Sequence, residues 1–404
     1  MKTFKPRWFL WLFFSLICSL RVNAVELVIE SLNGPVTPKE ISAFKAFLQT
    51  QPTGDSNNHN GWVYGNSGKD LEALGMVYEI SHDQGILDQM IRFADAALAS
   101  RNNPTNGRVI WTGKRELCWP NAATNSATAA YSGSENGDVV SHICYCAKLI
   151  LKTPALGPQA VGIGDERGYG KTYRERALTY VREMDRTMDS FVEPWFVSTN
   201  GNQFRWPETP LYTFNHGGTP IPWNQQTMLG DGFLRLAECH ELLGNDSARV
   251  KRYYDIVRAN MNWFLSDLHP GTKDGHPIYD WGYSAGRKSE DVPHGGYDIW
   301  GLCRAFESRR FGIPATTMTN FANTLNYVIY DPEKKVFHMR VDGTDGGKAP
   351  RKSLAASWTL LTEYSPNDDL YHRVAEANLE PAKTKPLEAA FILQMKNKRA
   401  AAKP

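Results

Sequence analysis

The chain has 404 residues, 42% of them hydrophobic, and its 45 Lys and Arg residues nearly balance its 43 Asp and Glu residues. This composition is sufficient for a large core, and no Pro-, Ser- or Gly-rich linker divides the chain, so we expect one folded unit. A near-neutral chain without a basic block lacks the concentrated Lys/Arg face of nucleic-acid-binding proteins, so we expect no nucleic-acid partner.

Residues 1–24 have the pattern of a secretory signal peptide. A basic head with Lys2, Lys5 and Arg7 precedes the apolar run 8–20, and the small-residue sequence that follows ends at Ala24. The run of about 13 residues is shorter than the roughly 20 that span a bilayer, so cleavage is favoured over a retained anchor. We therefore expect a secreted or periplasmic protein, not inserted in the membrane after cleavage, in which residues 25–404 form a single catalytic domain.

The hydrophobic pattern after the signal is helical almost throughout. Apolar residues at helical spacing in 71–78 and 86–98 predict two helices joined at Ser81-His82-Asp83. The same pairing recurs at 139–151 with 173–191, 225–243 with 248–268, 299–311 with 315–328, and 354–363 with 370–377, and the ranges 38–49 and 387–395 are expected to add another pair. No fixed repeat period is present, which argues against a short-repeat array. We predict an all-α protein, an α/α toroid (barrel) of about six or seven helical hairpins around a funnel.

Segments rich in aromatic and amide residues precede the first helix of several hairpins, at 61–66, 134–138, 222–226 and 289–300. In a toroid these first helices share a direction, so their N-terminal ends meet at one mouth of the funnel. Aromatic rings stack on sugar rings, and amides bond to sugar hydroxyls. The candidate substrate-binding residues are Tyr64, Asn136, Asp138, His142, His216, Trp223, Gln225, Trp281 and Tyr283. Helix capping and core packing are the structural alternatives for these residues.

The segment Ser289 to Trp300 is the strongest candidate for catalysis. It is polar and Gly-rich and leads into a helical pattern, so His294 and Tyr297 would share a face at a helix N-terminus, where unpaired N–H groups favour anions. This arrangement indicates proton transfer on an acidic substrate. The alternative is an N-terminal cap with a satisfied imidazole.

Metal and redox motifs are absent from the sequence. There is no H-E-x-x-H, paired C-x-x-C or EF-hand spacing, and the segment 342–347 lacks the closing Glu of a calcium loop and predicts a tight turn. Cys144 and Cys146 lie about 200° apart on an apolar helical pattern, which favours buried small hydrophobic residues over a redox or zinc site. We expect no metal ion and no cofactor.

Several segments together resemble a known enzyme family. They are Trp62-Val63-Tyr64-Gly65, Glu72 to Ile80, Glu135-Asn136, Trp223-Asn224-Gln225-Gln226, Leu236 to His240 and Glu290 to Trp300. In these segments the chain resembles the α/α-toroid polysaccharide lyases of family 38, which act on glucuronan or alginate. The resemblance spans nearly the whole mature chain and is clearest from Trp62 to Phe311. It implies β-elimination on an anionic polysaccharide.

Such an elimination requires that the C6 carboxylate be neutralised, the C5 proton removed and the departing O4 protonated. The resemblance implies a tyrosine and a histidine near C5 and O4, with Asn or Arg at the carboxylate. The catalytic candidates are Tyr297 as acid and base, His294 as its partner, and Asn224 with Arg287 as neutralisers, while His216 or His142 stays open as the histidine partner. A tyrosine pKa near 10 is too high for a base at neutral pH, so a nearby cation or donor must lower it.

Two other functions remain open from the sequence. A glycoside hydrolase on the same toroid would use two carboxylates, such as Asp138 with Asp298 or Glu290. A non-catalytic carbohydrate-binding protein would bind sugar without creating reducing ends or double bonds.

Overall fold

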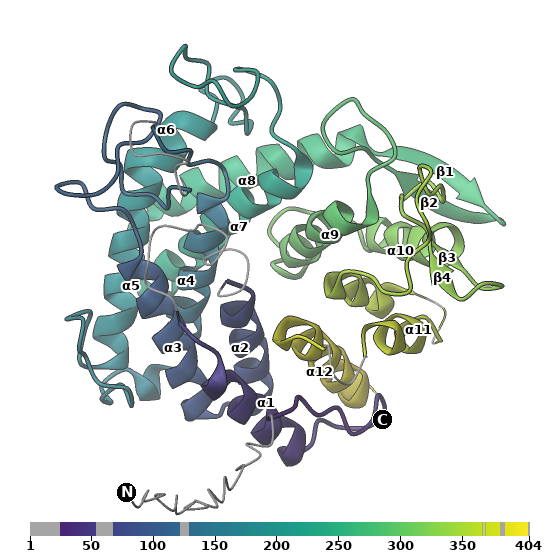
Figure 1. Ribbon diagram of the computed structural model, residues 1–404, viewed down its shortest axis with the longest axis horizontal. Coiled ribbons are helices and arrows are strands. Elements are labelled where there is room, and N and C mark those ends of the chain that lie inside the picture. The colour runs from purple at the N-terminus through teal and green to yellow at the C-terminus, as the bar shows by residue number, and fades with distance from the viewer. Residues whose placement is uncertain are drawn as a thin grey trace, which may run out of the picture.

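The computed structural model describes residues 25–53, 68–121, 129–365, 367, 369–379 and 384–402. Within them the helices form two layers around a common axis (Figure 1). The inner helices are α2 (Gly68–Ser81), α4 (Asn136–Leu151), α7 (Trp223–Leu243), α9 (Val292–Glu307), the 3₁₀ helix η5 (Ala356–Tyr364) and α12 (Pro386–Ala402). Each contacts the next, and α12 contacts α2, so the inner layer closes into a ring.

The outer layer covers this ring. It consists of α1 (Pro38–Thr50), α3 (Gln84–Ala99), α5 (Tyr173–Thr187), α8 (Ser247–Asp267), α10 (Ala315–Thr324) and α11 (Asp369–Asn378). The predicted α/α toroid is confirmed. The segment expected to be helical at 354–363 forms a 3₁₀ helix, and the helix expected at 173–191 ends at Thr187 and continues as the π-helical turn η3 (Met188–Val192).

Short elements fill the connections between the hairpins. Three are helical: η2 (Pro154–Leu156), α6 (Glu193–Phe196) and η4 (Leu325–Ile329). Two small antiparallel hairpins, absent from the sequence-based expectation, are β1 (His269–Lys273) with β2 (His276–Asp280) and β3 (Tyr330–Asp331) with β4 (Val336–Phe337). They are short and mostly exposed, so they lack the long alternating pattern that identifies strands. The predicted tight turn at 342–347 is present, where the Thr344 carbonyl accepts a hydrogen bond from the Arg340 amide.

Local capping explains where key helices begin. Helix α9 begins at Val292, earlier than the apolar pattern from 299 indicates, because Asp291 accepts a hydrogen bond from the His294 amide and Pro293 suits a first turn. Helix α1 begins with a capping box in which Thr37 and Glu40 exchange hydrogen bonds. Capping therefore decides the orientation of the polar residues that precede each helix.

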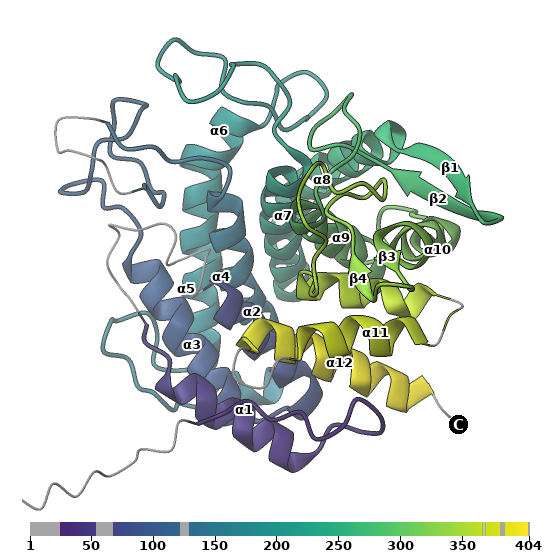
Figure 2. The same ribbon diagram turned by 45° about the vertical axis from the view of Figure 1, so that its right-hand side comes forward.

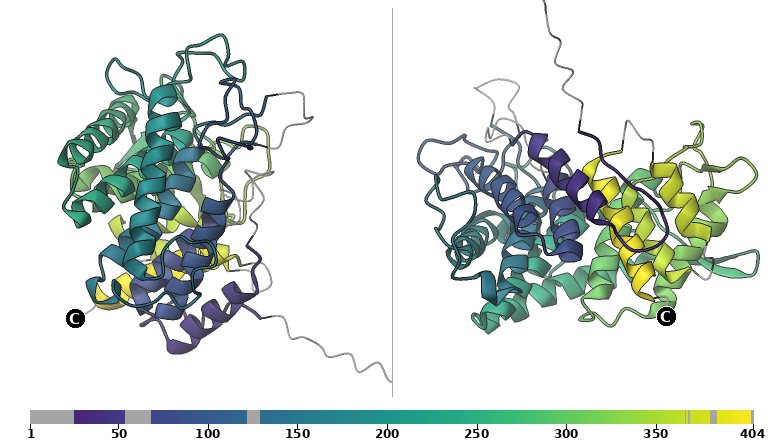
Figure 3. Two further views of the ribbon diagram at one scale, coloured as in Figure 1. Left: turned by 90° about the vertical axis from the view of Figure 1, so that its left-hand side faces the viewer. Right: turned by 90° about the horizontal axis from the view of Figure 1, so that it is seen from below.

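The two ends of the described chain meet to close the ring. Helix α1, near the N-terminus, lies beside α12, near the C-terminus (Figure 3). The ammonium of Lys396 on α12 lies 2.7 and 2.8 Å from the two carboxylate oxygens of Glu40 on α1, and both residues are almost fully buried. This ion pair joins the first outer helix to the last inner one, which confirms the pairing expected for 38–49 and 387–395.

The thiols match the sequence-based expectation. Cys118, Cys144, Cys146, Cys239 and Cys303 are free and buried, so Cys144 and Cys146 behave as small core residues. No helix in the described ranges is long and apolar enough to cross a membrane. The predicted signal peptide lies outside the described residues.

Candidate active site

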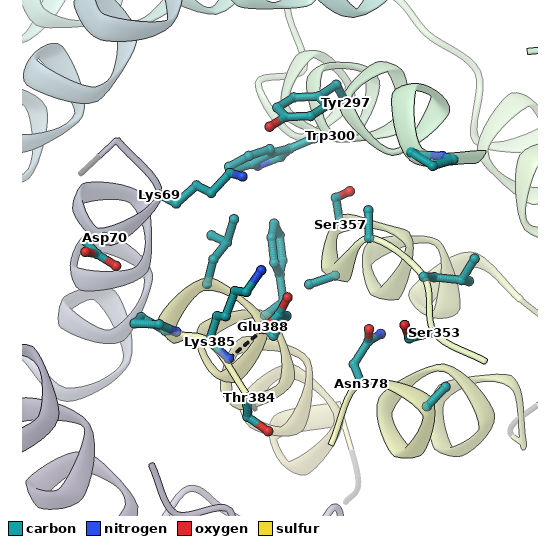
Figure 4. Close-up of a pocket in the computed structure, with 18 of the residues that line it drawn as sticks. Lys69, Asp70, Tyr297, Trp300, Ser353, Ser357, Asn378, Thr384, Lys385 and Glu388 are labelled. Atoms are coloured by element: carbon teal, nitrogen blue, oxygen red, sulfur yellow. Dashed lines mark hydrogen bonds between the residues drawn. The ribbon is translucent and has the colours of Figure 1, made fainter. Parts of the chain in front are cut away.

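The inner helices start at one end of the ring, where the loops that follow α3 and α6 also project (Figure 2). A cavity of about 940 Å³ opens at this mouth, between the N-terminal ends of α2, α9, η5 and α12. Of the segments expected to meet at the mouth, 289–300 contributes to this cavity and 134–138 and 222–226 do not, while 61–66 lies outside the described residues. The other lining residues come from α1, α2, α11, α12 and the segment that leads into η5. Figure 4 shows the side chains that line it.

Tyr297 lines this cavity. It follows the first turn of α9, and its ring lies 6.3 Å from that of Trp300, which also lines the cavity. Its hydroxyl has no hydrogen-bond partner among the residues that the structure describes. Burial and then the negative charge of Asp138 raise the pKa of Tyr297 to about 12, so the free protein carries a protonated phenol there.

Charged side chains on the facing walls are mostly cationic. Lys69, the second residue of α2, extends toward Tyr297 and Trp300, and Lys385 lies at the start of α12 (Figure 4). Arg351, which precedes η5, also lines the cavity. The lining acids are Asp70 and Glu388. Burial raises the pKa of Asp70 to about 7, although Lys69 opposes the shift. The cavity is therefore suited to an anionic ligand.

His294 does not join Tyr297 at the cavity. Its Nδ1 lies 2.7 Å from an oxygen of Asp291, and its ring packs edge-on against Tyr283, 5.2 Å away. The hydrogen bond to Asp291 raises the pKa of His294 above its ordinary value. His294 and Asp291 together form the N-terminal cap of α9, as in the alternative interpretation of a cap with a satisfied imidazole. This geometry does not meet the expectation that His294 and Tyr297 share one site.

The carboxylates proposed for a hydrolase also lie elsewhere. Asp298 is buried and accepts a hydrogen bond from the Trp281 indole at 2.9 Å, and burial raises its pKa well above the ordinary value. Glu290 is buried beneath the α9 cap, and burial raises its pKa to about 7. Neither lines the cavity, so the pairs that include Asp298 or Glu290 are withdrawn.

Within the described ranges, the group of side chains that could hold a metal ion is also at this cap. Glu290, Asp291 and His294 each offer one ligand atom, and these atoms lie within 4.8 Å of one another. The cap already uses them, since Glu290 accepts a hydrogen bond of 2.6 Å from the Asp291 amide and Asp291 pairs with His294. Helix capping therefore accounts for this cluster.

The three candidate residues at the head of α7 do not reach the cavity, and Trp223 serves packing. Trp223 is 2% exposed and packs against Trp263 and Phe264, each at 5.3 Å. Gln225 accepts a hydrogen bond of 2.6 Å from Ser134, and Asn224 is buried with its side-chain oxygen unpaired in the described structure. None of the three lines the cavity.

The head of α4 is similarly occupied. The side chain of Asn136 accepts a hydrogen bond from the Trp119 amide and donates to Ser132 and Gly133, so it holds the preceding loop. Asp138 lies 3.2 Å from the His142 ring. We reassign Asn136 from substrate binding to a structural role.

His142 belongs to a buried ion network that joins the inner helices. Its Nδ1 lies 2.8 Å from Glu72, whose carboxylate also pairs with Arg235 and Arg304. Burial opposes protonation of His142, but the charges of Asp138 and Glu72 outweigh it and raise its pKa to about 9. An imidazolium held on both sides by carboxylates has no free base nitrogen at neutral pH, which counts against His142 as the partner of Tyr297.

The remaining candidates lie in the surrounding loops. Trp281 is fully buried against Phe321 and Trp358, whereas Tyr283 is half-buried beside His294. Arg287 and His216 are exposed in loops and do not line the cavity. Tyr64 lies outside the described residues, so its predicted role stays a prediction.

Sequence reasoning missed Lys69, Asp70, Trp300, Arg351 and Lys385. The only local signal is position: Lys69 and Asp70 directly precede the apolar pattern of α2, and Trp300 follows Tyr297 by three residues. Nothing in the sequence shows that the ring closes α12 against α2, which brings Lys385 to the same cavity.

Comparison with known proteins supports the fold. No protein-family model matches the chain, and a search of curated proteins gives no match. The solved structure of a mutant of a reducing-end-xylose releasing exo-oligoxylanase matches with a TM-score of 0.50 and 12% identity, over 90% of this chain and 93% of that chain. A possible member of the GH105 family from Salmonella enterica matches with a TM-score of 0.49 and 10% identity, over 91% and 95%. The likeness to the oligoxylanase shows the α/α-toroid fold, and the resemblance to the family 38 lyases stays a prediction.

Proposed function

We propose that this protein is a carbohydrate-active enzyme that cleaves a uronic-acid polymer of the glucuronan or alginate type by β-elimination. The observation that carries the proposal is the Tyr297 phenol in a cavity of about 940 Å³ that is also lined by Lys69, Arg351 and Lys385. Elimination needs a proton-transfer group on one side of the sugar and cations at its carboxylate, and this cavity offers both.

The cations would lower the main barrier of the reaction. A carboxylate left fully negative opposes the carbanion that forms at C5, so positive charge that strengthens its hold as the proton leaves lowers the barrier. Lys69, Arg351 and Lys385 take the role that the sequence assigned to Asn224 and Arg287, because they face the cavity and those two residues do not. Trp300 offers a ring on which a sugar can stack.

Tyr297 would act as base and then as acid. In its phenolate form it takes the C5 proton, the electron pair forms the C4–C5 double bond, and the C4–O4 bond breaks. Tyr297 then returns the proton to the departing O4, so no water is consumed. A phenol with a pKa of about 12 is a poor base, because burial and the charge of Asp138 both disfavour the phenolate in the free protein. The Lys69 ammonium, which extends toward Tyr297, would therefore have to stabilise the phenolate in the substrate complex.

Hydrolysis is the second candidate. Asp70 lines the same cavity with a pKa of about 7, which suits a general acid, and Glu388 offers a second carboxylate. The oligoxylanase with this fold releases xylose, as its name states, and hydrolysis fits that comparison at least as well as elimination does. One scaffold hosts many chemistries, so the site has to decide.

A substrate panel separates these chemistries. Glucuronan, polymannuronate, polyguluronate and a neutral xylan would each be digested, with ultraviolet absorbance of unsaturated uronate and reducing ends measured together. Elimination predicts that both signals rise in parallel on a uronan. New reducing ends without absorbance would favour hydrolysis, and binding with neither signal would exclude both reactions.

Two substitutions then assign the chemistry. Tyr297→Phe should lower kcat on the uronan by about 10² or more, while Tyr279→Phe, a half-buried tyrosine on β2 outside the cavity, is the matched control. Asp70→Asn should retain elimination but abolish hydrolysis. Full activity in Tyr297→Phe would remove this tyrosine from the mechanism.

We also propose that the protein is exported, because a large polymer is met outside the cell and residues 1–24 have a signal-peptide pattern. Sequencing the N-terminus of the protein recovered from the periplasm or culture medium tests this, and an intact Met1 there would contradict it.

A further inference from the structure

A second concave site lies on the outer wall of the toroid. It has a volume of about 450 Å³ and is bounded by the C-terminal end of α3, the loop that follows it, the segment 167–169 and α5. Because α3 runs antiparallel to α2 in a hairpin, its C-terminal end lies at the level of the mouth. The groove is separate from the catalytic cavity, with which it shares no lining residue.

The groove is strongly cationic. Arg101, Arg167, Arg182 and Arg186 line it, and Glu183 is the acidic residue among its lining residues. Three of the guanidinium groups share that one carboxylate: Arg101 pairs with it from within the wall, Arg182 lies 3.2 Å from it, and Arg186 lies 3.0 Å from it. Three guanidinium groups on one carboxylate leave an excess of positive charge at this wall.

The two outer arginines are available to a ligand. The side chains of Arg182 and Arg186 are 64% and 55% exposed, whereas that of Arg101 is 9% exposed and is also fixed by a 3.0 Å hydrogen bond to Thr187. Arg101 thus orients Glu183, and Glu183 in turn orients Arg182 and Arg186. Guanidinium forks held in this way match the geometry of a carboxylate.

An aromatic ring completes the groove. Tyr169 lines it and is half-buried, with its backbone amide bonded to Asp165 at 2.7 Å. A tyrosine face beside guanidinium groups is suited to a sugar ring that carries a carboxylate, since the ring stacks and the acid pairs. A small inorganic anion would use the arginines and leave the tyrosine without a function.

We propose that this groove is a second binding site for the acidic polysaccharide, which holds uronate residues of a chain segment outside the catalytic cavity. The identity of the polymer rests on the proposed function. The site holds long chains at the mouth without taking part in bond cleavage. It therefore lowers KM for the polymer and leaves the turnover of short oligosaccharides unchanged.

The binding arm of the test uses gel electrophoresis through polyglucuronate or polymannuronate. Arg182→Gln/Arg186→Gln would be introduced into a Lys69→Gln/Lys385→Gln background, in which the catalytic cavity holds the polymer weakly. Retardation should fall at least about 5-fold, and Tyr169→Ala should lower it as well. The matched control is Lys251→Gln/Lys334→Gln, which removes two charges that are 80% and 69% exposed and lie outside the groove.

The kinetic arm uses the otherwise unaltered protein. Arg182→Gln/Arg186→Gln should raise KM for the polymer by a similar factor and leave turnover of a uronate trisaccharide unchanged. Arg182→Lys/Arg186→Lys, which keeps the charge but not the fork, should give intermediate values.

The outcomes separate the two proposals. Cleavage of uronans with unchanged retardation in the double variant overturns the groove and leaves the proposed function intact. Retardation that depends on Arg182 and Arg186 without cleavage of any uronan overturns the proposed function and supports the groove. Sodium sulfate would also be added to the protein that retains Tyr169 and to Tyr169→Ala. If it abolishes retardation equally in both, the groove is an anion site without sugar recognition, which also contradicts the proposal.

Discussion

The ion pair between Lys396 and Glu40 is expected to hold the ring closed, and Lys396→Met tests this. Lys396 and Glu40 are 1% and 0% exposed, and the ammonium contacts both carboxylate oxygens. Met keeps most of the side-chain volume and removes the charge. The substitution leaves a carboxylate buried between α1 and α12 with no counter-charge.

The magnitude follows from what remains around Glu40. Breaking a buried pair by removing one partner costs about 3–5 kcal/mol. The carboxylate keeps hydrogen bonds of 2.9 Å from the amides of Glu30 and Thr37, which places Lys396→Met at the lower end, about 3 kcal/mol. Glu40→Met should cost more, because it leaves the ammonium unpaired and removes the Glu40 part of the α1 capping box.

Urea unfolding of the two single variants and of Glu40→Met/Lys396→Met measures the coupling. Removing both charges is often close to neutral, so the double variant should be more stable than the sum of the single effects by at least about 3 kcal/mol. Because α12 carries Lys385 and Glu388 into the cavity, hydrogen exchange in α12 should increase in Lys396→Met before the rest of the ring opens. A single variant within about 1 kcal/mol of the original protein, or additive effects, would refute the reasoning.

Three further outcomes follow from the structure. Gly137→Ala would place a Cβ 2.5 Å from the Leu229 Cα, so α4 and α7 must separate, and thermal unfolding should show a loss of about 1–3 kcal/mol of stability. Gly230→Ala, where the nearest atom to the new Cβ is 3.9 Å away, is the tolerated control, and equal stability of the two variants would contradict this prediction. Folding raises the pKa of Asp70 from 3.8 to about 7, so its contribution to stability is present at low pH and is lost as the pH rises from about 4 to 7. In urea unfolding, Asp70→Asn should therefore lose less stability than the original protein across that range. Parallel curves of unfolding free energy against pH for the two proteins would count against this shift. Trp300→Ala should raise KM for the uronan by about 10-fold through the loss of one stacking contact. Trp195→Ala, in α6 outside the cavity, is the control that should leave KM unchanged, and an unchanged KM in Trp300→Ala would remove Trp300 as a stacking ring.

The fold could be predicted because its information is local. The apolar spacing in 86–98 corresponds to α3, and that in 38–49 to α1, since each helix needs only one buried stripe to be recognised. Helix starts are harder to predict, because they depend on capping. The true start of α9 at Val292 is set by Asp291, whose side chain the sequence presents only as one acid in a polar segment.

The site could be predicted only in part, because helix heads carry the same residue types for packing and for binding. Trp223 and Trp281 precede or begin inner helices, as the sugar-binding interpretation requires, yet both are buried against the outer layer. A large ring at a helix start can face either the funnel or the layer behind it, and the sequence does not distinguish the two faces. Tyr297 could be identified because it follows the cap of α9, and the structure places it on the wall of the cavity.

The position of Tyr297 has a consequence for the cation that it needs. His294 faces Asp291 and Tyr283, so the cap of α9 uses the imidazole that the sequence offered to the tyrosine. A cation that stabilises the Tyr297 phenolate would then have to come from another helix, and Lys69 near the start of α2 lines the same cavity and extends toward Tyr297 (Figure 4). Helix α2 is held against α12, and α12 is held by the Lys396–Glu40 pair. Loosening that pair should therefore reduce activity more than it reduces binding of the polymer, because the base depends on the spacing of Lys69 and Tyr297, whereas the outer-wall groove does not.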